Sequence, residues 1–287
     1  MAEHPITRVG VVGSGIMGSG LVEVAAAAGF DVVVRSRAQH SADAVIAGLE
    51  QSLDRQVIKG AIDDAARAAT LGRVKAVTDL AELADCDLVI ESVVEDLPTK
   101  HQLFGDLDRI CAPHTILATN TSTLAVVEMA MHTTRPDQVC GLHFFNPAPR
   151  MTLVEVVRAI TSSDATITTA KAFAASCGKT AVEVKDQAGF VVNALLFPYL
   201  NHAVKLLDSG VASRDDIDAA MKGGCNFPMG PLELLDLVGL DTSVAILDAL
   251  HAEFSEPHFA PAPLLRRMVA AEQLGRKSGQ GFYDYRK

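Results

Sequence analysis

A glycine-rich turn near the amino terminus restricts the folds open to this chain. The β-branched run at residues 8–12 leads directly into the sequence GSGIMG at residues 13–18, and a segment rich in helix-forming residues then continues to Gly29. A second β-branched run follows at residues 31–34. Strand, glycine turn, helix and strand in this order predict a βαβ unit, and the spacing of the three glycines is typical of its dinucleotide-binding form.

Each glycine of this turn has a separate role in binding a dinucleotide. Gly13 permits the tight turn, Gly15 lets the backbone approach the pyrophosphate, and Gly18 lets the helix pack closely on the strand. Ile16 and Met17 open the helix, whose free N–H groups and positive dipole end attract phosphate. We therefore predict that residues 13–18 bind the pyrophosphate of a nicotinamide cofactor, and the alternative is a purely structural turn.

Strand-like and helical runs alternate through the first two thirds of the chain. Strands are predicted near residues 74–77, 88–90, 116–118, 138–143, 151–158 and 180–184, and one long helical stretch covers residues 42–71. This alternation predicts an α/β fold, a Rossmann-type doubly wound, mostly parallel sheet. From about residue 189 the runs are helical, at 190–207, 213–222, 231–249 and 262–273. We expect a dinucleotide-binding domain at residues 1–187 and an all-helical domain at residues 188–287.

Composition excludes several classes of protein. The formal net charge is −10, so we expect no general attraction to nucleic acid or to anionic membranes. The chain shows neither a signal peptide nor an apolar run long enough to span a membrane, which predicts a cytoplasmic protein. The five cysteines are scattered without a CxxC pair, which fits reduced thiols and gives no reason to predict a metal site.

The end of the second strand bears on the choice of cofactor. An acid commonly binds the ribose 2′-hydroxyl of NAD at this position, but here the strand ends in Arg35, Ser36 and Arg37. Arginine and serine can bind a 2′-phosphate, which an acid would repel. The sequence therefore favours NADP(H) slightly over NAD(H), and the alternative is that the arginines are solvated and NAD(H) is used.

A second group of polar residues follows later strands. Asn120 and Ser122 come directly after the run at 116–118, and His143 stands at another strand end. Glu155 lies inside the apolar run LVEVV, where an unpaired acid would be costly to bury. We predict that Glu155 pairs with His143, because a carboxylate orients an imidazole and favours its charged form during proton transfer. A histidine satisfied within the core is the alternative.

Several motifs in a fixed order resemble the L-3-hydroxyacyl-CoA dehydrogenase family, especially its short bacterial 3-hydroxybutyryl-CoA dehydrogenase branch. They are GVVGSGIMGSG, DLVIESVVED, NTST, GLHFFNPAP, LVEVV, GFVVNALL, PMGPLELLDLVGLD and LGRKSGQGFYDY, which together span nearly the whole chain. The resemblance implies reversible, NAD(P)-dependent oxidation of a short-chain L-3-hydroxyacyl-CoA to the 3-oxoacyl-CoA. It also implies a homodimer formed through the helical domain.

The resemblance implies roles for individual residues. His143 would be the general base that removes the 3-hydroxyl proton, and Glu155 would orient it. Ser122 and Asn193 would hold the substrate oxygen. The cofactor would meet the turn and strand end already described, together with Glu95, Lys100, Asn120, Ser122, Asn146 and Lys277. Ser52 and Lys59, on the long helical stretch, would contact the CoA portion, and the alternative is that Lys59 is solvated, as most lysines are.

The chain departs from the family pattern at three positions. Ser36 replaces the usual acid, Arg150 stands where an apolar residue is usual, and Thr152 stands where lysine is usual. The last two changes either move a surface charge by two places or mark a substrate with an extra polar group. Other functions remain open: the same chemistry on an acyl-carrier-protein thioester or a free hydroxy acid, or a non-catalytic nucleotide-binding protein on the same scaffold.

Overall fold

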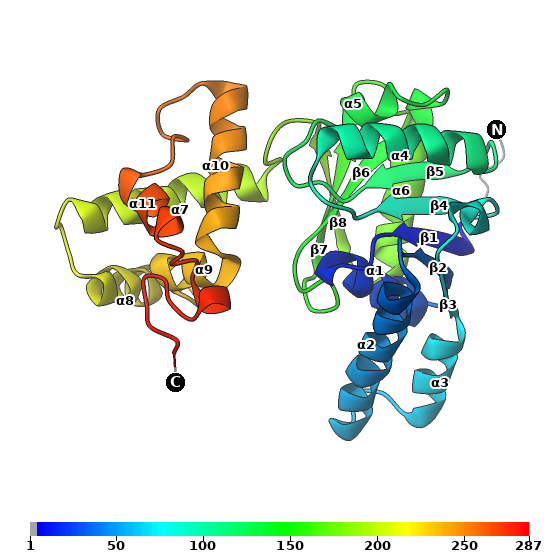
Figure 1. Cartoon of the computed structure of the whole chain (residues 1–287), viewed down its shortest axis with the longest axis horizontal. Coiled ribbons are helices and arrows are strands. Elements are labelled where there is room, and N and C mark those ends of the chain that lie inside the picture. Colours follow the sequence, from blue (N-terminus) through cyan, green and yellow to red (C-terminus); the bar gives the residue numbers. More distant parts are fainter. Residues whose placement is uncertain (1–4, 287) are drawn as a thin grey trace. The chain divides into compact units, whose positions relative to one another are not determined.

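The computed structural model describes residues 5–286, and it divides them into two compact units, one ending at Asp186 and the other beginning at Gln187 (Figure 1). The expected boundary lay after residue 187. The first unit contains the strands β1 (Arg8–Val12), β2 (Asp31–Arg35), β3 (Val74–Val77), β4 (Leu88–Glu91), β5 (Ile116–Thr119), β6 (Val139–Phe144), β7 (Leu153–Arg158) and β8 (Thr180–Lys185). Its α-helices are α1 (Ile16–Ala27), α2 (Gln39–Ile58), α3 (Asp64–Gly72), α4 (Leu97–Ile110), α5 (Val126–Ala130) and α6 (Asp164–Ser176).

The strands form one eight-stranded sheet in the order β3-β2-β1-β4-β5-β6-β7-β8. All neighbouring strands are parallel except β6 and β7, which are antiparallel. Helices cover both faces of the sheet (Figure 1), and a core of valine, leucine and alanine side chains fills the space between them. The predicted doubly wound, mostly parallel fold is confirmed. Its strand order reverses between β1 and β4, and such a switch point is where open α/β sheets bind ligands.

The predicted single helix at residues 42–71 is wrong, because the chain forms two helices there. Gly60 has a φ of +67°, a left-handed conformation that ends α2. The carboxylate of Asp63 then accepts a hydrogen bond from the backbone N–H of Ala66 and caps α3. The expected helix at residues 231–249 is divided in the same way at Gly239, whose φ is +102°.

The second unit is helical, as predicted. It contains α7 (Val192–Asp208), α8 (Arg214–Cys225), α9 (Pro231–Val238), α10 (Leu240–Phe254) and α11 (Pro263–Ala270) around its own apolar core. Asp236 of α9 holds the C-terminal tail, because its carboxylate accepts hydrogen bonds from the backbone N–H groups of Phe282 and Tyr283. Within residues 5–286, no helix combines the length and the apolar character that a membrane crossing requires.

Candidate functional site

The glycine turn occupies the switch point between β1 and β4. A Cβ atom on Gly13 would lie 2.2 Å from the carbonyl oxygen of Ser92, directly after β4. A Cβ on Gly18 would lie 2.1 Å from the carbonyl oxygen of Gly13, so the turn and α1 are in backbone contact. A Cβ on Gly15 would meet no protein atom within 4 Å. Two glycines are thus required by protein packing, whereas Gly15 leaves backbone open to a ligand at the helix start, near Ile16 and Met17. These features fit a dinucleotide pyrophosphate.

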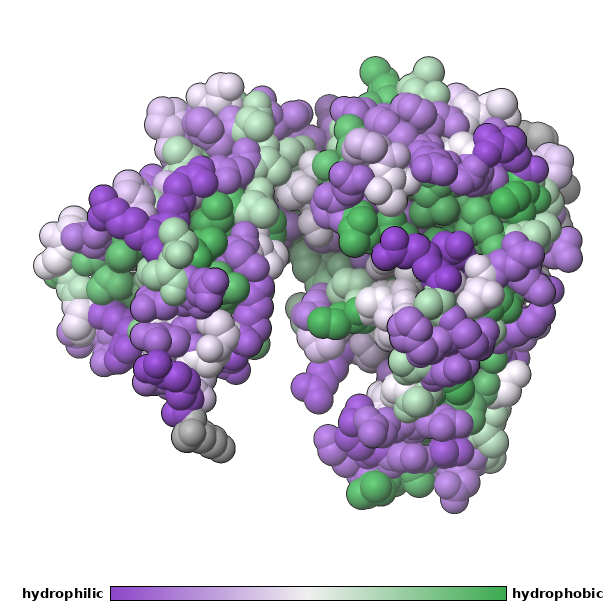
Figure 2. All heavy atoms as spheres, viewed as in Figure 1, coloured by the Kyte–Doolittle hydropathy of each residue, from purple (hydrophilic) through white to green (hydrophobic). Residues whose placement is uncertain are grey.

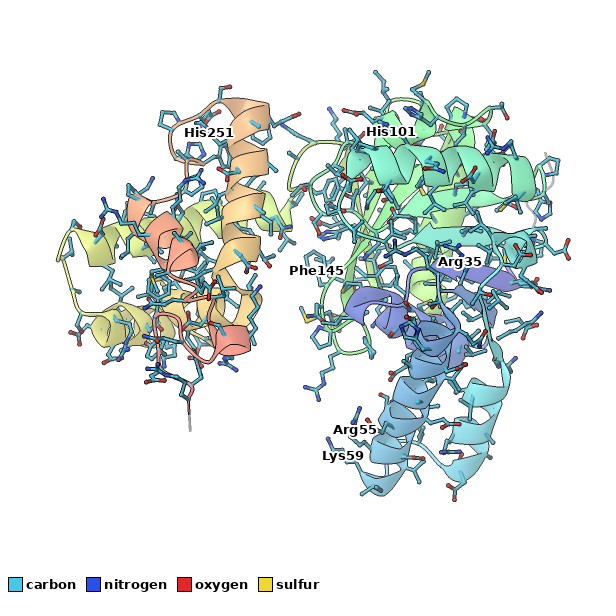
Figure 3. The ribbon with its side chains drawn as sticks, viewed as in Figure 1. Arg35, Arg55, Lys59, His101, Phe145 and His251 are labelled. Atoms are coloured by element: carbon cyan, nitrogen blue, oxygen red, sulfur yellow. The ribbon has the colours of Figure 1, made fainter. Side chains whose placement is uncertain are left out.

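The arginines at the end of β2 lie beside this turn. Arg35 pairs in register with Val12, and its carbonyl oxygen accepts a 3.0 Å hydrogen bond from the N–H of Gly13. Its Nε atom donates to the carbonyl oxygen of Thr78, and Figure 3 shows it at the end of β2. Arg37 is exposed, but Ser36 is buried and, within the described residues, its hydroxyl has no hydrogen-bond partner. The two arginines are therefore better placed than Ser36 to meet a ligand from solvent.

His143 and Glu155 form a buried pair because of strand register. The antiparallel strands β6 and β7 place the two residues directly opposite one another, so their side chains share one face of the sheet. Nδ1 of His143 lies 2.7 Å from Oε2 of Glu155, and the two side chains are only 4% and 1% exposed. Because the carboxylate is an acceptor, Nδ1 carries the hydrogen, and Nε2 is the atom that can take up a proton.

Ser122 reaches that second ring nitrogen. Its hydroxyl oxygen lies 3.0 Å from Nε2 of His143, although the two residues are on different strand ends. Asn120 is close by and fixes the end of β6, because its side-chain oxygen accepts a 2.8 Å hydrogen bond from the N–H of Phe144. The loop after β5 thus supports both the position of His143 and a hydroxyl beside its proton-accepting atom.

Glu95 and Lys100 are tied to the same loop. Nζ of Lys100 lies 2.7 Å from Glu95, whose other oxygen accepts hydrogen bonds from the N–H of Ser122, at 3.1 Å, and from the hydroxyl of Thr121. Burial of Glu95 opposes its ionisation. The Lys100 ammonium and these hydrogen bonds outweigh that effect and hold the pKa of Glu95 below its ordinary value of 4.5. Glu95 is therefore a fixed negative charge next to Ser122.

Sequence reasoning missed Glu91, which is completely buried and lies 3.0 Å from Nζ of Lys100. A signal was present, because Glu91 ends the apolar run LVIE just as Glu155 interrupts LVEVV. The rule that a buried acid needs a partner applies equally to both. Lys100 comes from α4, nine positions further on, and only the fold shows that it is the partner.

The other predicted residues stand apart from this group. Asn146 is exposed just after β6. Ser52 lies on α2, and Lys59 is the C-cap residue directly after it. Asn193 is buried in the first turn of α7, and Nζ of Lys277 donates to Asp241 at 2.6 Å; both belong to the helical unit.

Figure 3 shows Lys59 one turn from Arg55 at the far end of α2, and both side chains extend from the same side of the helix. The surface over that end is mostly hydrophilic (Figure 2). Both residues are exposed and present cationic groups to solvent, where they can meet an anionic ligand.

The arrangement is suited to moving one proton. It offers a ring nitrogen that can accept a proton, a buried carboxylate that stabilises the imidazolium once formed, and a hydroxyl beside the reacting position. Among residues 5–286, no group of three or more His, Cys, Asp or Glu side chains is placed to hold a metal ion.

Comparison with known proteins gives a consistent result over nearly the whole chain. The model of the 3-hydroxyacyl-CoA dehydrogenase NAD binding domain matches residues 8–187, and that of the 3-hydroxyacyl-CoA dehydrogenase C-terminal domain matches residues 189–285. A 3-hydroxybutyryl-CoA dehydrogenase from Clostridioides difficile is 47% identical over 98% of this chain and 100% of its own.

Two further relatives extend the comparison. The mitochondrial hydroxyacyl-coenzyme A dehydrogenase of Sus scrofa is 44% identical over 98% of this chain and 92% of its own. The crystal structure of the (S)-3-hydroxybutyryl-CoA dehydrogenase from Ralstonia eutropha is 41% identical, with a TM-score of 0.96 over 98% of this chain and 100% of that one.

Proposed function

The chain belongs to the 3-hydroxyacyl-CoA dehydrogenase family, and from this premise we propose that it interconverts a short-chain L-3-hydroxyacyl-CoA, such as 3-hydroxybutyryl-CoA, and the 3-oxoacyl-CoA. The observation that carries the proposal is the buried His143–Glu155 pair, in which the second ring nitrogen of His143, Nε2, faces the hydroxyl of Ser122. The names of the bacterial relatives support the short acyl chain.

In this proposal His143 moves the proton of the substrate hydroxyl. During oxidation Nε2 accepts it, and in the reverse direction the imidazolium returns it to the substrate oxygen. Glu155 holds Nδ1 and stabilises the imidazolium formed by the transfer. A nicotinamide cofactor whose pyrophosphate is held by the glycine turn would supply the acceptor or donor of the hydride. Ser122 and Asn193 donate hydrogen bonds to the substrate oxygen as it gains negative charge.

Substitution of His143 tests the assignment of the base. His143→Ala should lower kcat for reduction of acetoacetyl-CoA by roughly 10²- to 10⁴-fold, the usual contribution of a positioned general acid–base. His251→Ala is the matched control, because His251 is an exposed histidine on α10 (Figure 3), and it should retain wild-type turnover. Near-normal turnover by His143→Ala would exclude His143 as the proton carrier.

We assign the CoA portion of the substrate to α2, through Ser52 and Lys59. The exposed ammonium of Lys59 suits a phosphate-rich ligand in a chain whose net charge is −10. Lys59→Glu should raise KM for acetoacetyl-CoA and leave KM for a truncated thioester without the nucleotide unchanged. Wild-type activity on a carrier-protein thioester or a free hydroxy acid, without activity on the CoA thioester, would favour the alternative substrates.

For the cofactor we propose a slight preference for NADP(H), with Arg35 and Arg37 beside the 2′-phosphate. Glu95, Lys100, Asn120, Asn146 and Lys277 would complete its site. Arg35 and Arg37 support the preference because both lie at the strand end that adjoins the glycine turn, where an acid is absent. Charge reversal of both arginines should lower kcat/KM for NADPH at least tenfold more than for NADH. Unchanged use of NADPH would refute this argument, because the two arginines would then not bind the 2′-phosphate.

We further propose that the helical unit forms a homodimer. Several large apolar side chains of this unit are exposed, including Leu195 at 72% and Val211 at 68%. Burial of such side chains against a partner removes apolar surface from water and so favours association. Analytical ultracentrifugation should give twice the mass of one chain. Leu195→Glu should shift the equilibrium toward the monomer, because it replaces an exposed apolar side chain with a charge that is costly to bury against a partner.

A further inference from the structure

Glu91 is a fully buried carboxylate to which the proposed reaction gives no role. It is the last residue of β4, and its register partners are Val12 of β1 and Thr119 of β5. Glu91 therefore lies at the point where the strand order reverses, between the glycine turn and the loop that carries Ser122. A carboxylate in such a place is costly to bury, so its contacts are informative.

Three donors from three separate segments converge on Glu91. The N–H of Val93 donates to one oxygen at 2.6 Å, and the hydroxyl of Thr119 donates to the other at 2.7 Å. Nζ of Lys100, which is only 1% exposed, lies 3.0 Å from that second oxygen. Glu91 thus joins the loop after β4, the end of β5 and helix α4.

Lys100 extends this network toward the proposed base. Its ammonium is shared between Glu91 and Glu95, at 3.0 and 2.7 Å. Glu95 accepts the N–H of Ser122, and the Ser122 hydroxyl lies 3.0 Å from Nε2 of His143. An unbroken series of polar contacts therefore leads from Glu91 through Lys100, Glu95 and Ser122 to His143.

The charges explain why two carboxylates are needed. The negative charge of Glu91 already balances the buried ammonium of Lys100. One oxygen of Glu95 can therefore contact Lys100 while the other accepts the hydrogen bond from the N–H of Ser122. Without the charge at position 91, Glu95 becomes the only carboxylate within residues 5–286 that pairs with Lys100. Coulomb attraction in a buried site is strong, so Glu95 would be drawn toward Lys100 and away from the Ser122 amide.

We propose that Glu91 is a positioning residue that acts through Lys100 and Glu95 to hold Ser122 beside His143. The effect on turnover rests on the proposed function, whereas the effect on the Ser122 amide does not. Glu91 is completely buried, so it acts on the reaction only through the residues that it holds.

A double-mutant cycle tests this coupling. Glu91→Gln should lower kcat for acetoacetyl-CoA by about 10- to 100-fold, as loss of an outer partner commonly does, and change KM by less than about threefold. In the background of Lys100→Met, which breaks the path without leaving an unpaired buried ammonium, the same change should lower kcat by less than about threefold. If the fold losses of kcat from the two single changes instead multiply in the double variant, the two residues act independently. That result would indicate general damage to the fold and overturn the proposal.

Hydrogen exchange gives a readout that needs no substrate. The amide of Ser122, followed by NMR in the full-length protein, should exchange at least about tenfold faster in Glu91→Gln than in the wild type. Glu82→Gln is the matched control, because Glu82 is an exposed carboxylate 2.6 Å from Lys75. It should change neither exchange at Ser122 nor turnover.

The outcomes separate the two proposals. If Glu91→Gln does not fold, Thr119→Val can replace it, because this variant keeps every charge and removes one hydrogen-bond donor to Glu91. We then expect a smaller loss of kcat in Thr119→Val. In the background of Lys100→Met, Thr119→Val should cause no further loss. A wild type inactive on acetoacetyl-CoA, with faster Ser122 exchange in the variant, refutes the proposed function and supports the positioning role. An active wild type whose Glu91→Gln or Thr119→Val variant matches it in both turnover and Ser122 exchange refutes the positioning role.

Discussion

Replacement of Glu155 by glutamine tests the assignment of the proton carrier to a buried pair. The variant keeps the size and planar shape of the side chain but removes its charge. The glutamine amide also has an N–H group that can donate to Nδ1 of His143. In the wild type this nitrogen lies 2.7 Å from Oε2 of Glu155. A hydrogen bond in that direction places the ring proton on Nε2, the wrong tautomer for accepting a proton from substrate.

The magnitude follows from burial. The two side chains are 4% and 1% exposed, so water cannot replace the lost carboxylate when the imidazolium forms. Leaving one member of such a pair charged and unpartnered costs about 3–5 kcal/mol. At roughly 1.36 kcal/mol for each factor of ten, Glu155→Gln should lower kcat by about 10²- to 10⁴-fold. KM for acetoacetyl-CoA should change little, because a side chain this deeply buried does not meet the substrate.

The assay is steady-state reduction of acetoacetyl-CoA followed by nicotinamide absorbance, with circular dichroism to confirm folding. The control is Glu183→Gln on the neighbouring strand β8, which removes an exposed carboxylate 2.8 Å from Arg158 and should leave kcat within about twofold, as surface ion pairs contribute little. A folded Glu155→Gln enzyme with kcat within about fivefold of the wild type would refute the reasoning, since the uncompensated imidazolium would then carry no penalty.

Two other predictions follow from packing and from charge. Gly18→Ala would place a methyl group 2.1 Å from the carbonyl oxygen of Gly13 and should abolish dinucleotide binding in a fluorescence titration; Gly48→Ala meets nothing within 4 Å and should bind normally. Burial opposes ionisation of Asp108, but hydrogen bonds from residues 134–135 prevail and hold its pKa below 3.8. The stability that Asp108 contributes is therefore present above that value and lost as the pH falls through the lower folded pKa. Urea unfolding at pH values of about 5 and 2.5 should show a smaller acid loss in Asp108→Asn than in the wild type.

The fold class could be predicted from the sequence alone, and so could a glycine turn suited to a dinucleotide pyrophosphate, because both depend on local patterns. Three glycines at fixed spacing after a β-branched run specify the turn wherever the rest of the chain lies. The pairing of Glu155 with His143 was also predicted from the sequence, because an acid in an apolar run requires a partner and few are available nearby.

Which distant groups meet depends on the folding of the whole domain. Strand register places Glu155 opposite His143, and helix α4 returns Lys100 to the end of its own preceding strand beside Glu91. The burial of Ser36 likewise depends on what packs over the end of β2. Such contacts depend on strand order and packing across the whole sheet, which no local pattern of residues contains.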